Sequence, residues 1–167
     1  MEIKNTQKST VFTPAKDQLA KLLATENITV EHRQVPTAMF DVASRTLILP
    51  IWEDMSNELY DMLVVHEVGH ALYTPADNWQ LDHPEIPMSF VNVFEDVRIE
   101  KLMKRKYMGL AKSFYKGYSE LHDKDFFEVA DEDLSTFNLA DRANLYFKIG
   151  SFLDISFSDV EKENITL

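Results

Sequence analysis

The sequence predicts an α+β fold, and three observations lead to this prediction. Segments of strand composition are confined to residues 28–49, whereas later segments repeat apolar residues at spacings of three and four, the spacing of an amphipathic helix. Prolines at 75, 84 and 87 place a loop between two of these helical segments. The chain has 167 residues, of which 45% are apolar, enough for the core of one domain.

The first elements are expected to be one helix and three strands. Residues 13–27, TPAKDQLAKLLATEN, predict a helix, because Thr13 can cap it and Pro14 suits its first turn. A polar turn is expected to join the second and third strands. The three strands are predicted over 28–35, Ala38–Asp41 and Thr46–Leu49, and Pro50 ends the last of them.

The rest of the chain is predicted to be mainly helical. A helix should begin at about Asp54 or Ser56 and end at Tyr73. Residues 76–88 form a loop, and helices follow over 89–106 with Ser89 as cap, over 109–121, and over 135–153 with Ser135 as cap.

Composition limits the partners and metal ligands. With 17 basic and 28 acidic residues the net charge is -11, which argues against non-specific binding to nucleic acid or to an anionic membrane. No signal peptide or membrane-spanning segment is predicted, and there is no cysteine. Any metal site must therefore use His, Asp or Glu, and we expect a cytoplasmic protein.

The motif HEVGH, residues 66–70, is the strongest functional signal. Side chains at i and i+4 lie above one another on a helix, so His66 and His70 can bind one zinc ion from the same face. Glu67 lies beside these ligands, where it can act as general base toward a zinc-bound water. Gly69, unfavourable inside a helix by about 1 kcal/mol, suggests that a strand packs closely there. The alternative is a helix whose two histidines merely pack.

A third ligand is needed for a catalytic zinc site. Glu95 on the next helix is the preferred candidate, because it shares a largely apolar face and a carboxylate there needs a compensating charge. Asp96 and His83 remain alternatives. Asp96 and Glu100 are also candidates to hold the ring N–H groups of the histidines.

The combination of RTLILP, the HExxH helix and NVFEDVRIE resembles a zincin-fold metallopeptidase of the gluzincin type. More narrowly, residues 36–150 resemble the metallopeptidase domains of phages and bacteria that often precede a von Willebrand factor A-like region. The resemblance also points to Glu95, and it implies a small mixed sheet whose edge strand, carried onto Thr46–Leu49, pairs with an extended peptide.

The resulting expectation is one zincin-like domain over residues 1–167, which in this family often continues into further regions. It would bind Zn²⁺ through His66, His70 and Glu95 and hydrolyse peptide bonds of a peptide or protein substrate. It would act in the cytoplasm, or in the host cytoplasm if a phage encodes it. The alternative function is a non-catalytic zincin-like module that binds a protein partner. The sequence gives no oligomeric state.

Overall fold

A computed structural model describes residues 20–21, 25, 27–75 and 84–165. Within these ranges the protein is an α+β structure with a small three-stranded mixed sheet, as the sequence predicts. Ala20 and Lys21 are helical, whereas Thr25 and Asn27 are not, so the helix predicted over 13–27 ends before Thr25. The other residues of that predicted helix lie outside the described residues, as does His83. No helix in the described part of the chain is long and apolar enough to cross a membrane.

The sheet has the strand order β1-β3-β2. Strand β3 (Thr46–Pro50) pairs in parallel with β1 (Thr29–Arg33) and antiparallel with β2 (Met39–Asp41). All five residues of β3 are buried, which explains the apolar run Leu47–Leu49. The expectation of an edge strand at Thr46–Leu49 is therefore wrong: β3 is central, because strands pair with both of its sides, and β2 forms one edge.

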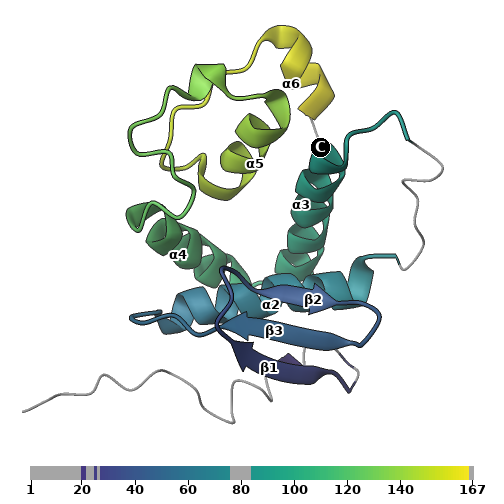
Figure 1. Ribbon diagram of the computed structural model, residues 1–167. Coiled ribbons are helices and arrows are strands. Elements are labelled where there is room, and N and C mark those ends of the chain that lie inside the picture. The colour runs from purple at the N-terminus through teal and green to yellow at the C-terminus, as the bar shows by residue number, and fades with distance from the viewer. Residues whose placement is uncertain (1–19, 22–24, 26, 76–83, 166–167) are drawn as a thin grey trace, which may run out of the picture.

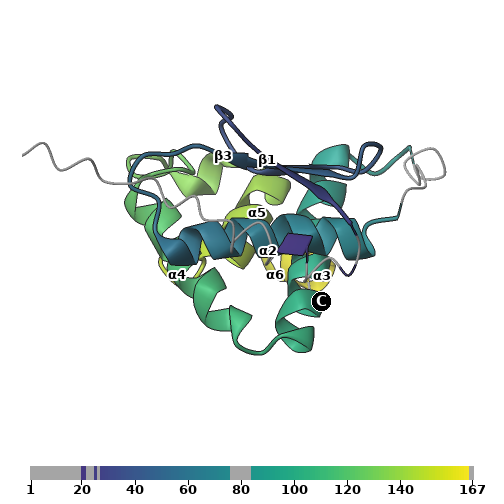
Figure 2. The ribbon, with the colours of Figure 1, turned by 90° about the horizontal axis from the view of Figure 1, so that it is seen from below.

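Helix α2 (Asn57–Tyr73) is the centre of the molecule. The Ser56 side chain caps it by accepting a hydrogen bond from the backbone N–H of Leu59. Figures 1 and 2 show the sheet against one side of α2, and α3 and α4 pack against other sides of this helix. Because these sides are covered, α2 buries apolar residues around most of its circumference, Leu63, Val64 and Val65 among them.

Helix α3 (Met88–Lys106) packs against α2 at Gly69. A Cβ built on Gly69 would lie 2.8 Å from Ile99 Cδ1 and 3.3 Å from Met103 Cγ. The glycine thus admits side chains of α3, and the expectation that a strand packs there is wrong. The predicted cap at Ser89 is also wrong, because α3 begins one residue earlier, with Pro87 at its N-cap position and no side-chain cap.

The last helices extend the helical part of the protein from α2 and α3. Helix α4 (Leu110–Asp123) packs along α2, and α5 (Leu139–Ile149) packs against α3. The helix predicted over 135–153 is shorter than expected and is capped by Asn138 rather than Ser135, which lies in a short 3₁₀ turn, Leu134–Thr136. A further helix that the sequence analysis did not predict, α6 (Asp159–Ile165), follows it.

Candidate metal centre

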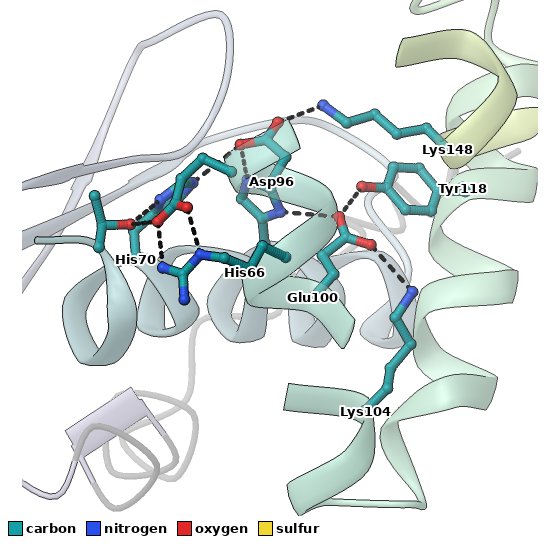
Figure 3. A network of polar contacts seen from close by, with 10 residues as sticks. His66, His70, Asp96, Glu100, Lys104, Tyr118 and Lys148 are labelled. Atoms are coloured by element: carbon teal, nitrogen blue, oxygen red, sulfur yellow. Dashed lines mark hydrogen bonds and ion pairs between the residues drawn. The ribbon is translucent and has the colours of Figure 1, made fainter. Parts of the chain in front are cut away.

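Three side chains from two helices converge on one point between α2 and α3. They are His66 and His70 on α2 and Asp96 on α3, and one potential ligand atom from each lies within 4.8 Å of the others (Figure 3). The Asp96 Oδ1 atom is 3.6 Å from His66 Nε2 and 3.2 Å from His70 Nε2. The three side chains are 15%, 21% and 18% exposed, so water can reach the point where they meet.

The spacing of these atoms suits zinc. With metal–ligand distances of about 2.1 Å, the edges of a tetrahedral zinc site are about 3.4 Å long. The two distances from Asp96 Oδ1 to the imidazole nitrogens lie on either side of that value. Two imidazoles and one carboxylate are a donor set that zinc accepts, and three protein ligands leave a position for water.

His66 is held by a carboxylate on the neighbouring helix. Its Nδ1 atom is 3.0 Å from Glu100 Oε1, and Lys104 and Tyr118 also donate hydrogen bonds to Glu100 (Figure 3). Burial raises the pKa of Glu100, but the hydrogen bond from His66 and the nearby positive charges outweigh it, so the net pKa is lowered. An ionised Glu100 can only accept, so His66 donates from Nδ1 and its Nε2 is directed at Asp96.

A chain of hydrogen bonds fixes the orientation of the His70 ring. The Thr74 hydroxyl donates to Glu95 Oε1 over 2.7 Å and lies 2.8 Å from His70 Nδ1. The hydroxyl has one hydrogen, which goes to Glu95, so Thr74 accepts from the Nδ1–H of His70. Arg98 binds both oxygens of Glu95 and fixes the end of the chain. His70 therefore also directs Nε2 toward Asp96.

Asp96 is fixed from the opposite side by α5. Lys148 Nζ donates to Asp96 Oδ2 over 2.8 Å, which leaves Oδ1 for the two histidines. Burial raises the pKa of Asp96, but the hydrogen bond with His70 and the charge of Lys148 hold the net pKa well below its usual range. The carboxylate is therefore ionised at neutral pH and able to bind a cation.

The convergence of two Nε2 atoms and a carboxylate oxygen requires a positive charge between them. Since both Nδ1 atoms already carry a hydrogen, a proton on Nε2 or a metal ion must supply that charge. Burial lowers the pKa of His66, but the hydrogen bond to Glu100 and the charges of Glu67, Glu100 and Asp96 raise it above the ordinary value. The arrangement therefore favours cation binding.

Glu67 belongs to the same group without holding a ligand position. The residue is only 7% exposed, and its carboxylate interacts electrostatically with His66, His70 and Asp96. Burial raises its pKa, and the positive charges of the two histidines oppose that effect only in part. Glu67 is thus a better proton acceptor than an ordinary surface glutamate.

The structure does not bring the Glu95 carboxylate into the group of side chains that could hold a metal ion; the carboxylate in that group is Asp96. Glu95 instead supports His70 through Thr74 and is tied to Arg98. Glu95 was expected on a largely apolar face that points inward, but Arg98, one turn further along the same helix, is exposed. The face of α3 that points inward carries Asp96, Ile99, Glu100 and Met103. These residues recur at spacings of three and four, and this pattern is the sequence signal for that face.

The remaining predictions for the site have separate outcomes. Glu100 holds a ring N–H as predicted. Lys148 and Thr74 were not anticipated, and neither carries a motif that would have indicated its role. No family model, curated protein or solved structure matches the chain, so function is inferred from the side chains of the site.

Proposed function

We propose that this protein is a zinc-dependent metallopeptidase. The observation that supports it best is the convergence of His66 Nε2, His70 Nε2 and Asp96 Oδ1, with each imidazole oriented by a hydrogen bond from its other nitrogen. The proposal differs from the sequence prediction in its third ligand, Asp96, and assigns Glu95 to the support of His70.

Zinc bound here would lower the pKa of a coordinated water to about 7 and polarise the scissile carbonyl. Glu67 would accept the proton of the attacking water and deliver it to the leaving amine. Its position directly after His66 keeps it beside the ligands, and its raised pKa suits both steps. Glu100, Thr74 and Lys148 keep the three ligands in place during these steps.

The substrate would lie along strand β2. In the three-stranded sheet, β2 pairs with β3 on one side only, and this edge faces the side from which α3, α4 and α5 rise (Figure 1). An extended peptide can add to such an edge by main-chain hydrogen bonds. We place the reaction in the cytoplasm, since a chain without cysteine is suited to a reducing compartment.

The test begins with metal analysis and zinc titration of the purified chain, followed by incubation of the zinc-loaded protein with a mixed peptide library. Glu67→Gln should bind zinc like the parent and lose most peptide cleavage. Unchanged cleavage by this variant would exclude Glu67 as the base. A parent protein that binds zinc but leaves every peptide intact would instead be a non-catalytic zincin-like module.

The choice of third ligand is tested by zinc affinity. Asp96→Ala should weaken zinc binding more than Glu95→Ala, whose effect should stay within the roughly 10- to 100-fold range of residues that act through a ligand. Asp123→Ala, at the exposed end of α4, is the matched control and should have no effect. The assignment is wrong if Glu95→Ala abolishes binding and Asp96→Ala does not.

A further inference from the structure

A cavity of about 1070 Å³ lies next to the candidate metal centre, between α3, α5, the segment after α5 and α6. Its lining includes Asp96, one of the three converging side chains, together with Glu100 and Lys148, which hold His66 and Asp96 in place. Its volume lies slightly above the roughly 300–1000 Å³ typical of ligand-binding pockets. A substrate that reaches the metal centre can therefore place a neighbouring part of its chain in this cavity.

The charge of the cavity is opposite to that of the protein. The whole chain has a net charge of -11, but the lining carries five cationic side chains and only two carboxylates, Asp96 and Glu100. Both carboxylates are already bound, by Lys148 and by Lys104. The five cations are Lys101, Lys104, Arg105, Lys148 and Lys162.

Two of these cations are available to a ligand. Lys101 and Arg105 are exposed, lie four residues apart on one face of α3, and form no ion pair with any carboxylate that the structure describes. Apolar side chains line the same cavity, including Phe147, Phe157 and the exposed ring of Tyr146. The lining thus offers positive charge beside an aromatic surface.

We propose that this cavity binds a peptide segment in which acidic residues lie next to an apolar one, and that it selects substrates of this class. Lys101 and Arg105 attract the carboxylates, and the aromatic rings cover the apolar side chain. The proposed selection of substrates rests on the proposed peptidase activity. The binding itself does not, because Lys101, Arg105 and the aromatic rings of the cavity are not among the side chains that could hold the metal.

Binding is measured by calorimetry with the 167-residue chain after treatment with a chelator. The probes are acetyl-Glu-Phe-Glu-amide and its neutral counterpart acetyl-Gln-Phe-Gln-amide. The acidic peptide should bind more tightly, and its affinity should fall as salt is added. The double variant Lys101→Ala/Arg105→Ala should weaken its binding about tenfold, the loss of two partly exposed charge interactions.

The control is Arg33→Ala/Lys112→Ala, which removes the same charges outside the cavity and should bind the acidic peptide like the parent. Equal affinity for the two peptides, no binding of either, or an unaffected Lys101→Ala/Arg105→Ala variant would overturn the proposal. Tighter binding of inorganic phosphate, or dimerisation that this variant abolishes, would assign the cavity to another occupant. Because no turnover is measured, these outcomes are independent of whether the protein cleaves peptides.

Discussion

Replacing Gly69 by alanine tests whether the contact between α2 and α3 sets the geometry of the metal centre. The added Cβ would lie 2.8 Å from Ile99 Cδ1 and 3.3 Å from Met103 Cγ. Ile99 and Met103 are both fully buried, so neither can yield without disturbing its own neighbours. The methyl group therefore forces a rearrangement at the place where α3 crosses α2.

Two opposing effects determine how much Gly69→Ala changes the free energy of unfolding. Overpacking of a buried contact costs about 1–3 kcal/mol, whereas alanine gains about 1 kcal/mol over glycine in helix propensity. The free energy of unfolding should therefore decrease by up to about 2 kcal/mol. In a protein of this size, each kcal/mol lowers the Tm by about 2–4 °C.

Thermal and denaturant unfolding would measure this effect, and a double-mutant cycle would identify its cause. Ile99→Val removes the Cδ1 atom that the new methyl group meets, so it should cost less in the Gly69→Ala background than in the parent. Gly109→Ala is the control, because no atom lies within 4 Å of its added Cβ. Additive effects of Gly69→Ala and Ile99→Val would refute the steric explanation.

The same variants connect packing with function. Asp96 lies one turn before Ile99 on α3, so a displacement of α3 moves its carboxylate relative to His66 and His70. Zinc affinity should fall in Gly69→Ala and recover in Gly69→Ala/Ile99→Val. Unchanged zinc affinity in a clearly destabilised Gly69→Ala variant would show that zinc binding tolerates a larger displacement of α3 than we infer.

Three further changes have defined outcomes. Glu100→Gln should weaken zinc binding by about 10- to 100-fold, because the charge that supports His66 is lost, and zinc titration would show this. Zinc affinity should decline on acidification, because protons compete for His66, whose pKa is raised, and the decline should begin at a higher pH than for an ordinary histidine. The hydrogen bond from Arg142 lowers the pKa of Glu161 from 4.5 to about 2, so its stabilising contribution is complete above pH 4.5 and is lost as pH falls toward 2. Acid unfolding of Glu161→Gln should therefore show a weaker pH dependence in that interval, and an identical profile would contradict the assignment.

The sequence by itself determined the parts of the site that lie on one element. The spacing of His66 and His70 is a property of any helix, and the signals for α2, its cap Ser56 and the following proline are all local. The three strands were likewise predicted to within a few residues, because their composition and turns are local features. The proposal of Glu67 as general base likewise came from its position in the motif alone.

Only the tertiary structure decided which residues complete the site. The choice between Glu95 and Asp96 depends on the rotation of α3 about its own axis, which the packing of Ile99 and Met103 against Gly69 sets. The two carboxylates are neighbours in sequence but project about 100° apart on a helix, so a modest rotation exchanges their roles. Lys148 reaches Asp96 from α5, far along the chain, and no local pattern specifies such a contact.

The order of the strands in the sheet was also decided by the tertiary structure. A short apolar strand can be central or at an edge, and the difference lies in how many other strands pair with it. The sequence showed that β3 would be a strand, but its parallel pairing with β1 and antiparallel pairing with β2 involve segments whose order no local signal specifies. Local periodicity therefore identified the helix that carries the histidines, and long-range packing selected the carboxylate that faces them.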